Sequence, residues 1–500
     1  MSELLNNLAF GFGVALSLQN ILLCLVGVLV GTLVGVLPGL GPLATMAMLL
    51  PITYVLEPTG ALIMLAGIFY GSQYGGSTTA ILVNMPGEAS SVVTTLDGHA
   101  MAKQGRAGVA LAVAALGSFV AGCFAAVVIA GFAVPISKFG QMLRPADYFS
   151  LMMLGIVCTI VLASGSLLKS LIMVALGLLI SMVGADLETG QQRMTLGFLE
   201  LYEGVDFVII AMGVFGVAEI LKNLEASDGR ITKSPIGRLW PTRSELRQSA
   251  PAVARGTLLG SILGVLPGGG ATLSAFASYT LEKKIARKPE RFGNGAIEGV
   301  AGPESANNAA AQTSFIPLLT LGLPSTAISA LMVGAMTIHG IIPGPDIITK
   351  QPDLFWGMIA SMWIGNLLLV IINLPLIGLW VSVLRVPYSI LFPIIVVLCC
   401  IGVYSLGNSA FDVGLMALFT LVGYLLLKFG FEPAPLLLAT ILGPLIEENL
   451  RRALVLSQGD PLVFVERPLS AAFLAIAAVL LALVTLPSLR ARRETVFVED

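Results

Sequence analysis

Long apolar runs dominate this chain, and most polar residues lie between them. Many runs approach or exceed the roughly 20 residues that a helix needs to cross the hydrocarbon core of a bilayer. They lack the two-residue alternation of a membrane β-barrel, so the pattern is helical. Together with the broken apolar segments, they predict roughly ten to twelve spans. The main runs are Val109–Val134, Phe149–Ala163, Leu171–Val183, Val205–Leu221, Met358–Leu384, Ile390–Tyr404, Val413–Leu427 and Ala471–Leu486.

Composition agrees with a protein that lives in lipid. Of the 500 residues, 56% are hydrophobic and 11% are charged, and the mean hydropathy is +0.93. Soluble domains carry about 25% charged residues. The predicted fold class is therefore an all-α polytopic membrane protein. The net charge of −2 argues against nucleic acid as a partner, and the 5 cysteines lie inside apolar runs, where they are expected to be small buried hydrophobes.

The positions of the basic residues predict orientation. The first Lys or Arg is Lys103, whereas seven lie between Lys222 and Arg255 and five between Lys283 and Arg291. Basic loops face the cytoplasm, so both of these segments are expected there, together with the C-terminal tail. The chain opens without the positive stretch of a cleaved signal peptide, which favours insertion through its own helices.

A motif occurs twice, 229 residues apart: GTLVGVLPGLG begins at Gly31 and GSILGVLPGGG begins at Gly260. At the same offset, VAEILKNL at Val217 matches IEENLRRAL at Ile446. These matches predict two copies of one unit. The predicted organisation is an N-terminal segment (1–19), repeat 1 (20–225), a basic cytoplasmic linker (226–254), repeat 2 (255–455), and a C-terminal transmembrane helix with a cytoplasmic tail (456–500).

The second copy of the motif is expected to form a re-entrant hairpin. Its two arms, Gly256–Leu266 and Ala271–Leu281, have 11 residues each and lie between two predicted cytoplasmic segments. At 1.5 Å per residue each arm spans only about half the hydrocarbon core. The first copy begins among uncharged loops instead, so the two repeats are expected to be inverted, as in secondary transporters. This topology places Arg451, Arg452 and Arg467 outside, which opposes the rule that basic loops face the cytoplasm.

The glycines of the motif have two expected roles. Glycine at every fourth position favours helix packing for Gly27, Gly31, Gly256 and Gly260. Proline followed by glycine ends a helix, which favours a site built by broken helices. Unwound carbonyls near Gly39, Gly41, Gly268 and Gly270 are predicted to suit Na⁺. The candidate site residues of this motif are Pro38, Gly39, Gly41, Pro267, Gly268 and Gly270.

Each copy also carries a second, unusually polar broken segment, at 70–91 and at 302–329. In both, a proline near small hydroxyl residues signals a helix start, with the proline expected at the first helical position. The unpaired N–H groups of such a start suit an anion. The alternative is that each hydroxyl bonds back to its own helix. The candidate residues are Ser77, Thr78, Thr79, Asn84, Pro86, Ser90, Ser91, Asn307, Asn308, Pro324, Ser325 and Thr326.

Four titratable residues near these segments remain open. Glu88 and Glu304 are candidates because carboxylates inside a membrane are usually functional, but either can instead cap a helix. His99 and His339 suit a proton relay by their titration near neutral pH, although His99 lies in a stretch typical of a polar loop. Motifs for ATP hydrolysis, zinc proteolysis and serine hydrolysis are absent from the sequence, so no enzyme activity is expected.

The strings YGGSTTAILVNMPGEASS and GPESANNAAAQTSFIPLLTLGLPSTA, with the two PGxG loops, resemble the large membrane subunit of the tripartite tricarboxylate transporters. The resemblance covers nearly the whole chain. It implies a secondary importer of carboxylates in the bacterial inner membrane, driven by Na⁺ or H⁺ and without another cofactor. It also implies two partners, a small four-helix membrane subunit and a periplasmic solute-binding protein.

The sequence thus predicts the translocating subunit of a binding-protein-dependent secondary transporter for a citrate-like or dicarboxylate substrate. Two other readings stay open. In a passive organic-anion channel the polar broken helices would line a pore, and flux would need neither a cation gradient nor a delivery partner. In a scaffold subunit the partner would transport, although the polar segments lie within this chain.

Overall fold

The computed structural model describes residues 2–37, 41–162, 166–186, 189–226, 236–266, 270–383 and 388–485. Over these ranges the chain is helical apart from one two-stranded hairpin, which confirms the all-α polytopic membrane fold. Within these described ranges, four helices are long and apolar enough to cross a membrane: α2 (Leu18–Val36), α7 (Ala107–Met142), α18 (Pro352–Asn373) and α21 (Ala410–Lys428). Shorter apolar helices are α3 (Pro42–Thr53), α8 (Pro145–Leu162), α9 (Leu167–Ser181), α16 (Ala327–Ile338), α20 (Tyr388–Gly407) and α24 (Pro468–Thr485).

The remaining elements are less apolar or shorter. The longer ones are α1 (Ser2–Ala15), α4 (Pro58–Val83), α11 (Ala218–Ala226), α12 (Arg243–Leu263), α13 (Gly270–Ile285), α14 (Glu298–Thr313), α15 (Phe315–Leu321), α19 (Ile377–Val383) and α22 (Ala434–Leu456). Short turns of helix are η1 (Ala89–Ser91), α5 (Val92–Thr94), η2 (Thr95–His99), α6 (Ala100–Lys103), η3 (Leu199–Leu201), α10 (Phe207–Ala211), η4 (Met212–Val217), η5 (Pro289–Arg291), α17 (Ile347–Lys350) and α23 (Val463–Glu466). Strands β1 (Gly184–Ala185) and β2 (Gln192–Arg193) pair antiparallel.

The repeated glycines bring two helix pairs into backbone contact. In the first copy α2 packs on α4, and a Cβ on Gly31 would overlap the carbonyl oxygen of Ile68. In the second copy α12 packs on α14, and a Cβ on Gly260 would overlap the carbonyl oxygen of Ala306. Glycine permits this approach because it has no side chain at the interface. The predicted packing role of these glycines is confirmed, and the two copies use it in the same way.

The two copies interlock through reciprocal contacts. Helix α9 of the first packs on α22 of the second, with Gly177 against the backbone of Leu436. The corresponding elements, exchanged between copies, also pack: α21 lies on η4, where a Cβ on Gly213 would come within 2.8 Å of the Met416 carbonyl oxygen. Likewise α14 lies on α7, and α4 lies on α18. Such exchange of equivalent contacts is the signature of a two-fold relation.

Helices α4 and α14 run in opposite directions where the copies meet. The rings of Tyr70 and Phe315, just beyond α14, have centroids 6.1 Å apart. Seven residues further along α4, Ser77 bonds to Glu304, eleven residues earlier in the chain than Phe315. These two pairs fix an antiparallel arrangement, because sequence number rises on one helix as it falls on the other. Equivalent helices of opposite direction are what inverted repeats require.

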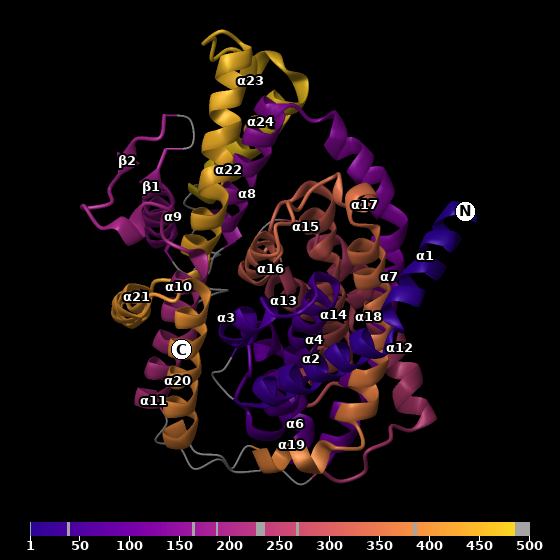
Figure 1. Cartoon of the computed structure of the whole chain (residues 1–500). Coiled ribbons are helices and arrows are strands. Elements are labelled where there is room, and N and C mark those ends of the chain that lie inside the picture. The colour runs from indigo at the N-terminus through magenta and orange to yellow at the C-terminus, as the bar shows by residue number, and fades with distance from the viewer. Residues whose placement is uncertain are drawn as a thin grey trace.

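Described parts of two predicted cytoplasmic segments, the start of α12 and the loop after α13, both contact the short stretch between α6 and α7 (Figure 1). Glu245 at the start of α12 forms ion pairs with Arg106 and Arg238, at 3.0 and 2.7 Å. Gln104 donates to the carbonyl of Asn294, in the loop after α13, at 2.9 Å. Helix α12 begins at Arg243, so the predicted end of the linker at 254 falls inside a helix. The boundaries of the predicted domains otherwise stay a prediction.

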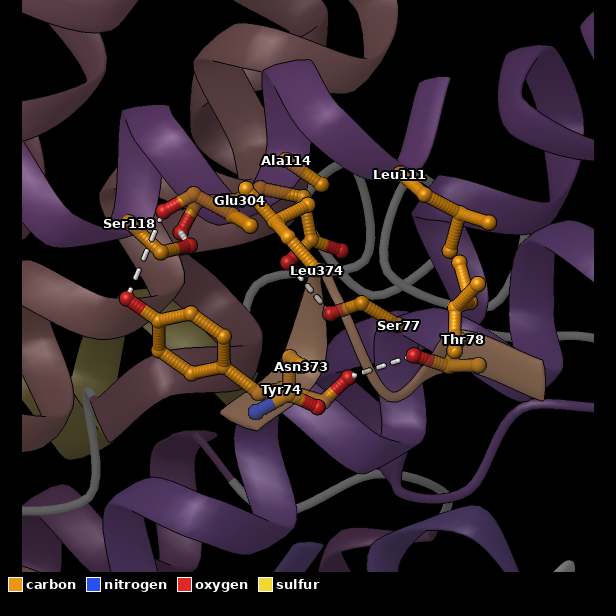
Figure 2. A pocket seen from close by; sticks show the side chains of 11 residues that line it. Tyr74, Ser77, Thr78, Leu111, Ala114, Ser118, Glu304, Asn373 and Leu374 are labelled. Carbon is orange, nitrogen blue, oxygen red and sulfur yellow. Dashed lines mark hydrogen bonds between the residues drawn. The ribbon is translucent and has the colours of Figure 1, made fainter. Parts of the chain in front are cut away.

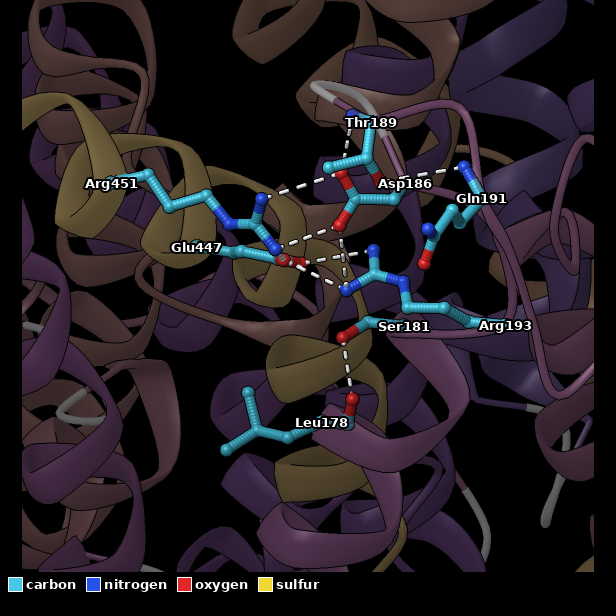
Figure 3. A network of polar contacts seen from close by, with 8 residues as sticks. All are labelled: Leu178, Ser181, Asp186, Thr189, Gln191, Arg193, Glu447 and Arg451. Carbon is cyan, nitrogen blue, oxygen red and sulfur yellow. Dashed lines mark hydrogen bonds and ion pairs between the residues drawn. The ribbon is translucent and has the colours of Figure 1, made fainter.

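The opposite end, around α23, carries the arginines that opposed the predicted topology (Figure 1). Arg451 pairs with Asp186 and Glu447, each at 2.7 Å, and Glu447 also binds Arg193 of the hairpin (Figure 3). Arg467 binds Asp147, whose side chain is fully buried. On α22, Arg452 also forms an ion pair with Glu448. Each of the three arginines is thus neutralised by a carboxylate and serves the fold of this end.

Candidate functional site

Both polar broken segments have the same backbone geometry. Helix α4 ends at Asn84, which adopts the left-handed conformation with φ 58°, and α15 ends at Gly322 with φ 72°. Four residues later a new helix begins in each copy with a reciprocal capping box: Glu88 with Ser91 in the first copy, and Thr326 with Ser329 in the second. Each capping residue satisfies free backbone N–H groups of the new helix. The break is therefore a repeated, fully capped feature of the fold.

The prolines of these breaks are not at the first helical position, contrary to the prediction. Pro86 and Pro324 each lie two residues before the capping residue, and the helices begin at Ala89 and Ala327. The physical reason is that the extended backbone continues for two residues beyond each proline, so Glu88 and Thr326 occupy the N-cap positions and bond reciprocally with Ser91 and Ser329. The prolines instead hold the extended stretch between the two helices.

The centre of the arrangement is Glu304 on α14, whose side chain is only 1% exposed. Ser77 on α4 lies 2.5 Å from one carboxyl oxygen, and Thr94 on α5 contacts the other. The carboxyl thus joins the second repeat to two elements of the first. We call Glu304, Ser77 and Thr94, with Glu88, Ser90 and Asn307, the carboxyl cluster.

The rest of the carboxyl cluster surrounds Glu88, which stands at the start of η1. Ser90 donates to Glu88 at 2.7 Å, and Asn307 of α14 approaches the same oxygen at 3.4 Å. The next residue of α14, Asn308, donates to Ser118 of α7 at 2.7 Å. Amides of the second repeat therefore bind the first break and α7 of the first repeat.

A small cavity lies beside Glu304 (Figure 2). Its volume is about 20 Å³, which is room for about one water molecule. Figure 2 shows Ser77 turned toward Glu304 along its wall. The other polar lining groups come from Tyr74, Thr78, Ser118 and Asn373. A space of this size does not hold a tricarboxylate, so the structure shows the cluster closed.

Asp97, in η2 just after the first break, fixes this segment to the start of α14. Its carboxyl accepts from the backbone N–H groups of Gly293, Gly295 and Ala296 at 2.7–2.9 Å, and from Tyr279 at 3.0 Å. The side chain is fully buried. A carboxylate satisfied by several donors is a strong anchor. The first break and the α13–α14 loop are thereby tied together.

The structure brings some predicted site residues together and leaves others apart. Ser77, Ser90 and Asn307 belong to the carboxyl cluster, and Thr78 and Asn308 lie within its surroundings. Ser325 bonds only to the Ser314 carbonyl among described groups, and Thr326 bonds within its own capping box. Thr79 and Ser91 are buried and bond to nearby backbone, whereas Asn84 and Pro86 are exposed.

The glycine tips are only partly described. Pro38, Gly39, Pro267 and Gly268 lie outside the described residues. Gly41 caps the start of α3, and Gly270 begins α13 with φ 47°. A Cβ on Gly270 would come within 3.3 Å of Thr326, so the second tip lies against the second break. Binding of Na⁺ at these tips stays a prediction.

Sequence reasoning missed three residues of this region. Thr94 follows Ser90 and Ser91 at helical spacing, and that spacing would have placed it on the same face. Ser118 is the one hydroxyl in the apolar run Val109–Val134, which is itself a signal of an interior polar contact. Asn373 ends α18, and nothing in its local sequence points to the cavity.

Neither repeat contributes a lysine or arginine to the lining of this cavity. Among the residues that the structure describes, no group of three or more His, Cys, Asp or Glu side chains is arranged to hold a metal ion. The arrangement offers hydroxyls, amides and two carboxyls instead. Chemically, this set can exchange protons, bind a monovalent cation or hydrogen-bond a polar substrate.

Comparison with known proteins gives three findings. Residues 21–438 match the profile of the tripartite tricarboxylate transporter TctA family. The chain is 57% identical over 501 residues, and over the full length of both chains, to an Agrobacterium vitis protein described as an uncharacterized 52.8 kDa protein in the TAR-I ttuC′ 3′ region. A second uncharacterized protein of that organism, in the TAR-II ttuC′ 3′ region, is 61% identical over all of its length and 48% of this chain. No solved structure matches.

Proposed function

The chain belongs to the tripartite tricarboxylate transporter TctA family and is a multi-pass membrane subunit of such a system, not an enzyme. From this premise we propose that it is the large, substrate-translocating subunit of a binding-protein-dependent secondary transporter. The proposed substrates are small carboxylates, citrate-like or dicarboxylate, and the proposed location is the bacterial inner membrane. The proposed partners are a small four-helix membrane subunit and a periplasmic solute-binding protein that delivers the substrate.

One observation carries this proposal, the meeting of two antiparallel helices at the carboxyl cluster. Helix α4 leads into the first break, and α14 leads through α15 into the second. Polar groups at the contact of inverted units are where secondary transporters hold substrate and coupling ion. Irregular backbone and buried polar groups are tolerated in lipid only where protein or water surrounds them. The capped breaks and the buried cluster of this chain satisfy that condition.

The closed cavity supports a carrier that must move. A substrate-sized space would have to open by displacement of one repeat against the other, which is the alternating access proposed for inverted repeats. The driving cation would be Na⁺ or H⁺. Carbonyls at the glycine tips near Gly41 and Gly270 would suit Na⁺, and the carboxyl cluster would suit either ion.

The decisive experiment is uptake into proteoliposomes. The vesicles would hold this chain with its small membrane subunit, and labelled citrate and a panel of dicarboxylates would be supplied with and without the binding protein and an imposed Na⁺ or pH gradient. We expect accumulation above the external concentration that needs both the binding protein and a gradient. The rate of uptake should be the same with and without ATP.

A passive channel is the competing function, and the same experiment separates the two. A channel would equilibrate the carboxylate without accumulation, and neither the gradient nor the binding protein would change the flux. That result would overturn the carrier proposal. A second check is to fix α4 to α14 by a crosslink between cysteines introduced at Ser77 and Asn307, after which a carrier should stop and should recover when the disulfide is reduced.

A further inference from the structure

Glu304 stands in surroundings that do not favour an ionised carboxylate. Its side chain is 1% exposed, and within the described part of the chain it has no arginine, lysine or histidine in ion-pair contact. Its recorded side-chain partners are the hydroxyls of Ser77 and Thr94. An unpaired buried charge is costly, and such groups are neutralised by a proton or by a bound cation.

The hydrogen bonds around Glu304 can all be completed with the carboxyl in its neutral form. The Ser77 hydroxyl lies 2.5 Å from Glu304 and 2.9 Å from the carbonyl oxygen of Gln73. A hydroxyl has one hydrogen, so Ser77 cannot donate to both. In a neutral acid, Glu304 donates to Ser77, Ser77 donates to Gln73, and Thr94 donates to the second Glu304 oxygen. Every hydrogen then has an acceptor.

The adjoining cavity supplies a second, independent observation. Asn373 lines it, is 6% exposed, and its side-chain oxygen has no donor among the described residues. A buried acceptor without a donor points to an ordered water. The cavity has room for about one. A water there would satisfy Asn373 and would give the Glu304 carboxyl a partner for proton exchange.

Other titratable groups on the elements packed around α14 do not take this role. Glu88 acts as a helix cap, Asp97 is held by backbone N–H groups, and Glu282 forms a bidentate pair with Arg255. The remaining titratable side chains of these elements are those of Tyr70, Tyr74, Cys123, Lys138, His99, Arg243, Glu245, Arg247, Tyr279, Lys283, Lys284 and Glu298.

We propose that Glu304 carries the coupling proton of the transport cycle. Its carboxylate takes one proton from water when the cluster opens to the side of substrate entry, and the neutral acid is the closed form seen here. When the cluster opens to the other side, the proton passes to water there and the carboxylate is restored. Each cycle moves one proton with the substrate and so offsets one of its negative charges. This step rests on the proposed function as a carboxylate carrier.

The first test measures the protonation of Glu304 without any substrate. Infrared difference spectra of the purified chain would be recorded for the wild type against E304Q, whose amide reproduces the donor and acceptor of the neutral acid and so preserves the fold. We expect a protonated-carboxyl band at neutral pH that is lost in E304Q. The matched control is E298Q, at the half-buried start of α14, where Glu298 pairs with Arg291; this change should remove only ionised-carboxylate bands. An ionised Glu304 at neutral pH, or one whose band responds to Na⁺, overturns the proposal.

The second test measures coupling in proteoliposomes of the complete complex. An inward gradient of one pH unit supplies about tenfold accumulation per proton. We expect the wild type and E298Q to use this gradient, whereas E304Q loses the stimulation yet still exchanges labelled for unlabelled carboxylate. Retained stimulation in E304Q, or wild-type uptake driven by Na⁺ alone, overturns the proton assignment and leaves the carrier function standing. Absence of any carboxylate uptake would instead overturn the carrier function, and the infrared result would still decide the state of Glu304.

Discussion

Single glycines control how closely the helices of each repeat approach. Gly31 and Gly260 occupy equivalent positions 229 residues apart, and each faces a backbone carbonyl of the neighbouring helix. A methyl group at either position would have to push a whole helix away, because backbone cannot rotate aside as a side chain can. The cost of a substitution therefore depends on what each glycine faces.

Gly260→Ala is expected to lower the free energy of unfolding by about 1–3 kcal/mol, the usual cost of overpacking. The physical reason is the overlap of the new Cβ with the Ala306 carbonyl oxygen. The measurement is thermal unfolding of the purified protein in detergent.

Gly131→Ala on α7 is the matched control, since a Cβ there meets nothing within 4 Å. Alanine is the better helix former, so this variant should be unchanged or slightly more stable. Equal destabilisation of both variants would contradict the packing role of Gly260.

Local patterns at the residue scale were predictable, whereas contacts between distant residues were not. The four-residue glycine spacing predicted close packing of these helices, because a helix presents every fourth residue on nearly one face, but it did not identify α4 and α14 as the partners. The contacts of Glu304 with Ser77 and Thr94 join residues 227 and 210 positions apart. Only the meeting of the two inverted units brings them together, and one sequence carries no signal of that register.

At the scale of elements, the start of α12 is held by charge as well as by a capping box. Thr242 and Glu245 bond reciprocally, and Glu245 also binds Arg106 and Arg238. Partial burial opposes ionisation, but the hydrogen bonds from Thr242 and the two arginines outweigh it and hold the pKa of the Glu245 carboxyl below its ordinary value. This end of α12 lies outside the apolar helices, next to α6.

Glu245→Gln is expected to lower stability at neutral pH by about 1–2 kcal/mol, as for hydrogen bonds to a charged group. A carboxyl with a lowered folded-state pKa contributes stability above its ordinary pKa of 4.5, and the contribution disappears as the pH falls through the folded-state value. The difference in melting temperature between wild type and variant should therefore be full at pH 7 and shrink below about pH 4.5.

Glu57→Gln serves as the comparison for that pH series, because Glu57 precedes α4 without a side-chain cap bond. Its melting temperature should follow the wild type at every pH. A Glu245→Gln difference that grows in acid would contradict the assigned direction of the shift.

The breaks show what sequence reasoning reached at this scale and where it stopped. Proline beside small polar residues correctly located both interruptions, which lie 238 residues apart (Asn84 to Gly322). The first helical residue was wrong because Glu88 and Thr326 cap the helices from a position that a proline rule does not consider. The offset also exceeds the 229 of the glycine motif, so the second copy contains extra residues between its two motifs.

At the scale of the whole molecule, arginines at both ends are paired with carboxylates. Near α6, Arg106 and Arg238 share Glu245, and near α23 Arg451, Arg452 and Arg467 each have a carboxylate partner. The basic-loop rule counts lysines and arginines near the membrane and is not a rule about net charge. The arginines near α23 therefore still oppose an external position for this end, and the larger number of basic residues in the segments that contact the α6–α7 region is what favours the predicted orientation.

Single cysteines at Arg287 and Asp460 are expected to lie on opposite sides of the membrane. Both positions are exposed, the first after α13 and the second between α22 and α23. In right-side-out vesicles, an impermeant thiol reagent should label Asp460→Cys at once and Arg287→Cys only after the membrane is opened.

The parent chain, with its native cysteines, reports the background for this labelling experiment. Cys24 and Cys399 are buried, and the other three lie within helices. Labelling of both introduced cysteines from the same side would mean that the second repeat does not have the inverted orientation.

The shared packing of α2 on α4 and of α12 on α14 places Ala66 of the first repeat at the position of Glu304 in the second. The two repeats share the same helix packing, but only the second has an ionisable side chain at this position. If the repeats exchange shapes during transport, the inward-open and outward-open forms are not mirror images in energy. One of the two forms is then more populated at rest. Partners and gradients therefore shift an equilibrium that is already unequal.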